Sequence, residues 1–273
     1  MPVSRSSEGR VVGWQPKTGQ QALFEWAIWF GIVALTVFCW RVMTAGTIWA
    51  FVEDAPHQAA DLLGRMLPPR WDYANSLWAP LWDTINMATL GTMIAIVIAT
   101  PLAFLAASNT TPSTILLQPL ALLIIVASRS VNALIWGLLL VAVLGPGVLA
   151  GIIAIALRSI GFIGKLLYEA IEEIDETQVE AIRATGASPA QIIAYGIVPQ
   201  IMPAFATIAV FRWDINIRES TVLGLVGAGG LGLALEASLN TLAWPQVTTI
   251  LLIILATVVV SEWVTARVRR TII

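Results

Sequence analysis

The stretch Thr84–Ser128 reads TINMATLGTMIAIVIATPLAFLAASNTTPSTILLQPLALLIIVAS and contains no charged side chain. A helix that crosses the roughly 30 Å hydrocarbon core of a bilayer needs about 20 apolar residues, so this stretch is too long for one membrane span. The polar cluster at 108–113 divides it, because Ser, Asn, Thr and Pro are typical of turns. The stretch therefore predicts two membrane helices, at about 80–107 and about 114–144.

The whole chain has the composition of a membrane protein. Of its 273 residues, 58% are hydrophobic and 12% are charged, about half the charged share of a soluble domain. Its mean hydropathy is +0.82. The formal net charge of −2 gives no indication of nucleic-acid binding. A single cysteine, Cys39, and a single histidine, His57, exclude an internal disulfide and favour no metal site.

Four further apolar runs complete the predicted topology. The first, at 22–51, is longer than the apolar segment of a signal peptide, and we expect it to be retained as a span. Tryptophans lie toward its ends, as they do at membrane interfaces. The other runs lie at about 148–169, 198–216 and 247–265. The fold class is predicted to be an all-α integral membrane protein with six transmembrane helices.

The predicted spans divide the chain into five parts. These are an N-terminal tail (1–21), the first transmembrane helix (22–51), an extracytoplasmic connection (52–79), a transmembrane core (80–268) that contains a charged loop at 170–197, and a C-terminal tail (269–273). Six spans place both termini on one side. That side carries Arg5, Arg10, Lys17, Arg183, Arg267, Arg269 and Arg270. The positive-inside rule then predicts that both termini and the 170–197 loop are cytoplasmic.

The segment 169–186 is the most charged part of the chain and cannot lie in hydrocarbon. Good helix formers occupy 176–185, and Gly186 is suited to end that helix in a left-handed conformation. Ser188 is suited to cap a following helix with Pro189 at its first position. The loop is therefore predicted to form two short helices that project into the cytoplasm.

The spacing of this loop resembles the EAA loop of ABC importer permeases: Glu-Ala-Ala, three residues, Gly, nine residues, then Ile-x-Leu-Pro. The matching residues are Glu180, Ala181, Gly186 and Pro199, and the departures are Ile182, Gly196 and Val198. In that family the loop is the coupling helix that docks on a cytoplasmic ATPase. The resemblance thus implies that the ATPase-coupling residues are Glu180, Ala181, Arg183, Gly186 and Pro199.

The segment 216–232, NIRESTVLGLVGAGGLG, and the run 161–172 are similar to PhnE-type permeases of phosphonate importers. Together the resemblance covers about 80–268. It implies the MetI-like type I ABC permease fold in a bacterial plasma (inner) membrane. It also implies a homodimer of permease copies, two ABC ATPase subunits that bind ATP and Mg, and an extracytoplasmic substrate-binding protein. The implied cargo is a phosphonate, phosphate or phosphite.

Two glycine motifs are not nucleotide sites. The segment 227–232 fits G-x-G-x-x-G, but a membrane span precedes it and no acid follows at the required distance. Gly161-x-x-Gly164-Lys165 lacks the spacing of a P-loop. We expect no cofactor, metal or catalytic residue in this chain, so energy has to come from another subunit or from an ion gradient.

Arginines at membrane depth are the candidates for the substrate path. Arg129 and Arg158 lie near the middle of predicted spans, and no acid occurs between Asp83 and Glu169. A guanidinium can bind an oxyanion through two parallel hydrogen bonds. The candidates are Arg129, Arg158, Arg212, Asn216, Arg218 and Ser220. Structural roles stay open, because Arg129 can bond to helix-end carbonyls and Arg158 can pair with Asp214.

Three other functions stay open. A secondary anion transporter would need inverted repeats and broken helices, and we detect no convincing repeat. A membrane-embedded enzyme would need a constellation of reactive residues at one depth, which the sequence lacks. An ABC permease for another small solute would have the same coupling loop.

Overall fold

The computed structural model describes residues 3–5, 11–14 and 19–272. Its regular secondary structure is helical apart from one short antiparallel pair in the tail, β1 (Val3–Arg5) and β2 (Val11–Trp14). The predicted all-α class is confirmed, and the β pair is an addition that the sequence did not predict. The chain forms two compact units, Met1–Ala60 and Asp61–Ile273.

The first unit contains the helix α1 (Gly19–Thr44) and the greater part of α2 (Trp49–Met66). With 26 residues, α1 is about 39 Å long, enough to cross a bilayer. The expected span 22–51 was too long at its C-terminal end. Residues 45–46 form a turn and a new helix begins at Trp49, because Gly46 and its β-branched neighbours are poor helix formers.

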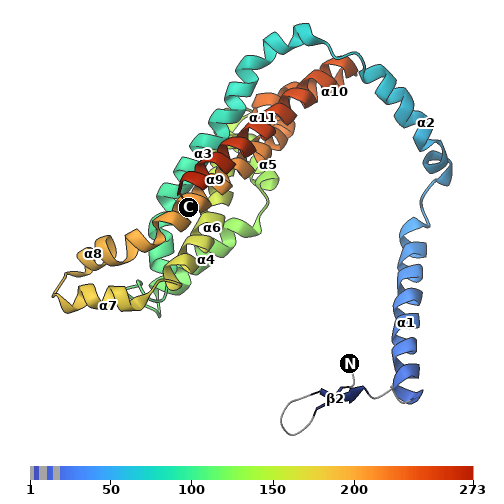
Figure 1. Ribbon diagram of the computed structural model, residues 1–273. Coiled ribbons are helices and arrows are strands. Elements are labelled where there is room, and N and C mark those ends of the chain that lie inside the picture. Colours follow the sequence, from blue (N-terminus) through green and yellow to red (C-terminus); the bar gives the residue numbers. More distant parts are fainter. Residues whose placement is uncertain (1–2, 6–10, 15–18, 273) are drawn as a thin grey trace. The chain divides into compact units, whose positions relative to one another are not determined.

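The second unit holds the remaining helices (Figure 1). In chain order they are η1 (Trp71–Leu77), α3 (Trp78–Ala106), α4 (Leu117–Ser130), α5 (Ala133–Leu144), α6 (Val148–Glu172), α7 (Glu176–Ala184), α8 (Pro189–Ile192), η2 (Ile193–Ile197), α9 (Val198–Leu223), η3 (Gly224–Ala228), α10 (Gly230–Asn240) and α11 (Trp244–Ile272). Among the described residues, five helical stretches are long and apolar enough to cross a membrane, or six if the bent pair α4–α5 counts as one span.

Helix α6 lies at the centre of this unit and packs against α3, α4, α5 and α9. Small residues allow the close approach, as in other membrane helix pairs. A Cβ added at Gly91 of α3 would lie 2.7 Å from Ile155 Cγ2 of α6. Buried alanines and isoleucines on the facing sides of α3 and α6 complete this part of the core.

The third predicted span, 114–144, is not one straight helix. It consists of α4 and α5, which meet at 86°. Val131 is extended, and Asn132 begins α5 by accepting a hydrogen bond from the Leu134 N–H at 3.1 Å. The end of α4 is held against α6 by Ser128, which bonds to the α6 backbone. A tertiary contact therefore directs the bend, and the apolar sequence gives no sign of it.

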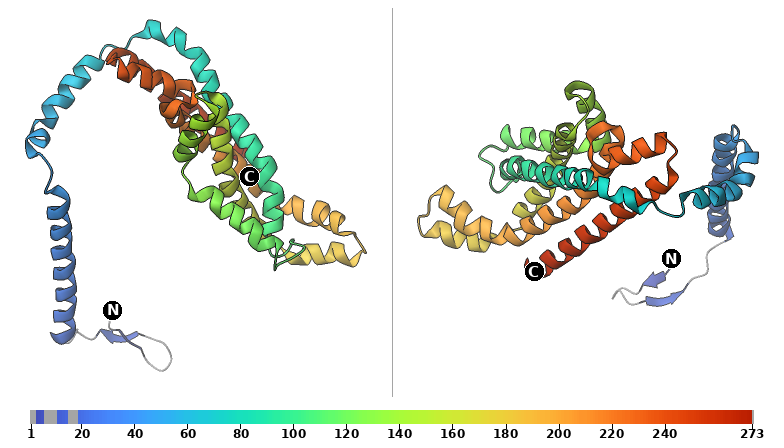
Figure 2. Two further views of the ribbon diagram at one scale, coloured as in Figure 1. Left: turned by 180° about the vertical axis from the view of Figure 1, so that it is seen from behind. Right: turned by 90° about the horizontal axis from the view of Figure 1, so that it is seen from above.

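Helices α7 and α8 project from one end of the helix assembly (Figures 1 and 2). The turn between α3 and α4 lies at the same end. The Asn109 side chain donates to the Ile171 carbonyl at 2.6 Å, and the Ser108 N–H donates to Glu172 Oε1 at 2.7 Å. Both loops therefore lie on one side of the assembly, as the alternation of membrane spans requires.

Candidate functional site

The first candidate site is the projection, residues 175–197. Asp175 caps α7 by accepting a hydrogen bond from the Thr177 N–H at 3.0 Å. The hydrogen bonds from Thr177 hold the pKa of the Asp175 carboxyl below its usual range. The carboxylate is therefore charged at neutral pH, which suits the positive end of a helix dipole.

The turn between α7 and α8 has the predicted chemistry. Gly186 lies in the left-handed region at φ +83°, where other residues are strained. Ser188 and Gln191 form a capping box, in which the Ser188 N–H donates to Gln191 Oε1 at 2.8 Å. Pro189 takes the first position of α8. The prediction of two short helices joined at a glycine is confirmed.

One face of α7 packs against the helix assembly. Val179 belongs to a buried cluster with Leu167, Ile171 and Ile197. A Cβ added at Gly196 would lie 3.4 Å from Ile182 Cδ1, so this glycine allows η2 to pack closely under α7. The projection is thus a stiff extension of α6 and α9.

The polar surface of the projection is open to solvent. The five residues predicted to couple to an ATPase are all exposed: Glu180, Ala181, Arg183, Gly186 and Pro199. Glu180 and Arg183 also line a cavity of about 360 Å³ between α7 and the start of η2. Charged groups at an exposed, rigid end are suited to bind another protein.

The second candidate site is a buried polar cluster, here called the inner network: Thr92, Arg158, Ser159, Arg212, Asn216 and Glu219. Its centre is the Glu219 carboxylate of α9. Arg158 Nε lies 3.3 Å from Glu219 Oε1, and Arg212 Nη2 lies 3.0 Å from Glu219 Oε2. Two guanidiniums therefore share one carboxylate, which leaves the cluster with a net positive charge.

Arg212 is the most buried arginine of the inner network, with 1% of its surface exposed. Its Nε donates to Ser159 Oγ at 2.9 Å, and its guanidinium lies 5.0 Å from the ring centroid of Phe162. Asn216 donates to Thr92 Oγ1 at 2.7 Å and to Ser159 Oγ at 3.1 Å. These bonds connect α3, α6 and α9 at one level.

A second cluster, here called the outer network, comprises Asp214, Arg218, Ser261 and Glu262. Asp214 pairs with Arg218 on α9 and accepts from Ser261 Oγ of α11 at 2.7 Å. Arg218 Nη1 lies 3.2 Å from Glu262 Oε1. The helical period separates the two networks, because positions 212, 216 and 219 share one face of α9 and positions 214 and 218 share another.

The structure places the residues predicted to line the substrate path in different surroundings. Arg158, Arg212 and Asn216 meet in the inner network, and Arg218 belongs to the outer one. The alternative pairing of Arg158 with Asp214 is wrong, because Glu219 takes that arginine. Ser220 is buried and donates to the Ile217 carbonyl of its own helix at 2.8 Å.

Arg129 stands apart from both networks. It is exposed at the C-terminal end of α4. Within the part of the chain that the structure describes, its guanidinium has no ion pair or hydrogen bond.

Sequence reasoning missed four members of these networks, Thr92, Ser159, Ser261 and Glu262, and it also missed Phe162, whose ring lies beside Arg212. Thr92 and Asn216 are 124 residues apart, and Asp214 and Ser261 are 47 apart. No local pattern reports such pairs. The one available signal was helical spacing on α9, which places Arg212, Asn216 and Glu219 on a common face.

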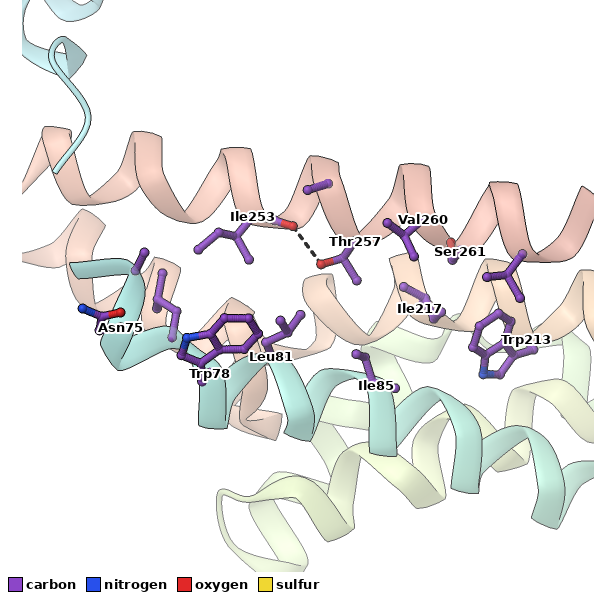
Figure 3. A pocket seen from close by; sticks show the side chains of 14 residues that line it. Asn75, Trp78, Leu81, Ile85, Trp213, Ile217, Ile253, Thr257, Val260 and Ser261 are labelled. Carbon is purple, nitrogen blue, oxygen red and sulfur yellow. Dashed lines mark hydrogen bonds between the residues drawn. The ribbon is translucent and has the colours of Figure 1, made fainter. Parts of the chain in front are cut away.

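A further cavity lies apart from the inner network. It has a volume of about 510 Å³ and runs between the start of α3, α9 and α11. Figure 3 shows Asn75 and Trp78 at one end and Trp213 and Ser261 at the other. Its lining is mainly apolar, and Thr257 donates to its own helix at 2.8 Å. An oxyanion would be poorly solvated there, so this cavity is no candidate for a charged cargo.

An apolar helix assembly has one charged network inside it, a second at its surface and a rigid polar projection at one end. These features define a multi-pass membrane protein of the transport-permease class. The model of one family, "Binding-protein-dependent transport system inner membrane component", matches residues 99–273. The chain belongs to this family.

Two named relatives show which members of the family this chain is similar to. The chain is 41% identical over 256 residues to the phosphite transport system permease protein PtxC of Stutzerimonas stutzeri, covering 93% of this chain and 89% of that protein. It is 39% identical over 240 residues to the phosphate-import permease protein PhnE of Mycolicibacterium smegmatis, covering 88% of this chain but 44% of that protein.

Solved structures support the fold. The MetNI methionine ABC transporter in inward-facing conformations matches with a TM-score of 0.62 at 24% identity, covering 72% of this chain and 96% of that chain. An amino acid ABC transporter matches with a TM-score of 0.62 at 19% identity, covering 73% and 95%. The MetI-like fold predicted from the sequence is confirmed.

Proposed function

We propose that this chain is the membrane-spanning subunit of an ATP-driven importer, and that its cargo is a small phosphorus oxyanion: phosphite, phosphate or a phosphonate. The observation that carries the proposal is the similarity to the phosphite permease PtxC, which extends over 93% of the chain. A binding protein would deliver the anion on the extracytoplasmic side.

The projection is the proposed contact with the ATPase. Its exposed residues Glu180, Ala181, Arg183 and Gly186, with Pro199 at the start of α9, would seat it on a partner that binds ATP and Mg. Because one face of α7 packs on the core through Val179, a displacement of α7 would be transmitted to α6 and α9. Those two helices carry the inner network.

Two copies of the chain would enclose the translocation path, with one ATPase attached to each. Both termini and the projection would lie in the cytoplasm, and the 52–79 connection would lie outside, as the positive-inside rule predicts. The described helices are consistent with this arrangement, because the 107–116 turn and the projection share one end of the assembly.

The test is reconstitution of the chain with its ATPase and binding protein in lipid vesicles. We expect uptake of phosphite, phosphate or methylphosphonate that needs ATP on the ATPase side and the binding protein on the other side. Uptake driven by an ion gradient without the ATPase would instead support a secondary transporter. ATP-driven uptake of methionine, with no uptake of any phosphorus oxyanion, would support a permease for another solute.

A variant of the projection tests its proposed contact with the ATPase. Glu180→Lys reverses an exposed charge and leaves the buried Val179 unchanged, so the chain should still insert and fold. We expect the ATPase to be lost from the purified complex and uptake to stop. An unchanged complex with unchanged uptake would contradict the role of the projection.

A further inference from the structure

The structure assigns the cargo contact to Arg129: we propose that this guanidinium binds the transported oxyanion, whereas Arg158, Arg212 and Arg218 hold the helices together. This inference rests on the proposed function, because it presupposes an oxyanion as cargo.

The first support is the charge balance of the two networks. Arg158, Arg212 and Arg218 are each paired with at least one carboxylate at 3.3 Å or less. The carboxylates that they contact are Asp214, Glu219 and Glu262, so the described networks hold three cations and three anions. An incoming anion would have to compete with these carboxylates for the three arginines. Arg129 involves no such competition, since its guanidinium has no partner among the described residues.

The second support is the depth of Arg129 in the membrane. The hydroxyl of Ser128 bonds to the Leu157 carbonyl and accepts from the Gly161 N–H at 2.9 Å. These groups lie about 14–20 Å along α6 from its Val148 end, near the middle of a 30 Å hydrocarbon core. The backbone of Arg129 therefore lies near the middle of the hydrocarbon core, where an anion most needs a counter-charge.

The third support is the rigidity of the attachment. Ser128 bonds to the Leu157 carbonyl and to the Gly161 N–H, two α6 backbone groups that lie one helical turn apart. Gly161 is required for this contact, because a Cβ there would lie 2.8 Å from the Arg129 backbone nitrogen and 2.9 Å from Ser128 Oγ. The backbone of Arg129 is thus fixed while its side chain stays exposed. The fixed backbone keeps the guanidinium within one side-chain length of this point on α6.

The contact also has a mechanical consequence. Ser128 forms its hydrogen bonds with α6 at the turn that carries Arg158 and Ser159, the α6 members of the inner network. Any movement of α6 driven through the projection would shift the Arg129 backbone as well. The cargo-binding guanidinium would then move together with the helix that opens or closes the path.

The experiment uses the complete reconstituted complex with phosphite as the probe. With saturating binding protein and phosphite, Arg129→Gln should lower the maximal rate of phosphite uptake about tenfold or more, the scale of one lost charge-assisted hydrogen bond. Arg129→Lys should recover part of this loss, because it restores the charge without the two-pronged geometry. ATP hydrolysis and the amount of assembled complex should stay at the wild-type level. The matched variant Arg212→Gln should instead lower the amount of folded complex.

Lipid phosphate is the other oxyanion that Arg129 could bind, and labelling separates the two sources. In a Cys39→Ser background, Ser130→Cys places one thiol beside an intact Arg129, and this variant must first support uptake. Phosphite should slow its reaction with a maleimide, and adding Arg129→Gln should abolish that protection. Labelling that responds to the lipid headgroup and not to phosphite would overturn the inference.

The outcomes separate this inference from the proposed function. If the wild-type complex takes up no phosphorus oxyanion, the proposed function fails. If the wild type takes up phosphite and Arg129→Gln does so at the same maximal rate, only the assignment of Arg129 fails.

Discussion

Replacing Glu219 by Gln should destabilise the folded protein by about 3 kcal/mol. The carboxylate lies 3.3 Å from Arg158 Nε and 3.0 Å from Arg212 Nη2. Glutamine keeps the shape and removes the charge, so two guanidiniums then face each other without an anion. Removal of one partner of a buried ion pair costs about 3–5 kcal/mol. The lower end applies, because the Glu219 side chain is 21% exposed.

The assay is thermal unfolding of the purified chain in detergent, followed by tryptophan fluorescence. A loss of 3 kcal/mol corresponds to a melting temperature about 6–12 °C lower, at about 2–4 °C per kcal/mol for a chain of roughly this size. The control is Arg65→Gln. It breaks a pair with Asp61 in which both side chains are more than 60% exposed, so its effect should stay below about 1 kcal/mol.

A double variant tests the cause of the effect. Glu219→Gln combined with Arg158→Gln restores the original net charge of the inner network by removing one of the two facing cations. We expect the double variant to be less destabilised than the sum of the single variants by about 1 kcal/mol or more, within the usual range for contacting residues. Simple additivity would refute the claim that Glu219 holds the two arginines together.

Three further predictions concern local features. Gly186→Val should strain the left-handed turn at φ +83° by about 1–2 kcal/mol and release the ATPase in a pull-down; retention of the ATPase would contradict this. The pKa of Asp175 is lowered by its hydrogen bonds from Thr177, so its capping of α7 is fully present above the unfolded value of about 3.9 and is lost as the pH falls through the folded-state pKa. Amide protection factors in α7 should therefore be constant from pH 7 to 5 and fall below about pH 4, and Asp175→Asn should remove this dependence. Gly161→Ala should separate α4 from α6 at a cost of about 1–3 kcal/mol, seen as a lower melting temperature; a wild-type value would show that the contact yields freely.

The charged loop illustrates what local sequence can predict well. The conformations of Gly186 and Ser188 depend on residues only a few positions away in the chain. Their predicted roles, as the end of one helix and the cap of the next, are therefore confirmed by the structure. The fold class is predictable for a similar reason, because the length of an apolar run is itself the property that a bilayer selects.

The candidate site was only partly predictable. The arginines at membrane depth were found by their cost in hydrocarbon, about 2.5–3.5 kcal/mol each on insertion scales. The acid that pairs with each arginine could not be predicted, because Asp214 and Glu219 lie on the same helix within reach of several cations. Packing of α6 against one face of α9 brings Arg158 to Glu219, and packing of α11 against the other brings Ser261 and Glu262 to Asp214 and Arg218.

By itself the sequence determined the membrane class, the approximate spans and the chemistry of the projecting loop, since these depend on composition and on neighbours within one or two helical turns. Tertiary structure alone decided the 86° bend between α4 and α5 and the separation of Arg129 from the paired arginines. The reason is that a hydroxyl at Ser128 and a missing side chain at Gly161 act only when two helices meet. Their 33-residue separation along the chain carries no signal of that contact.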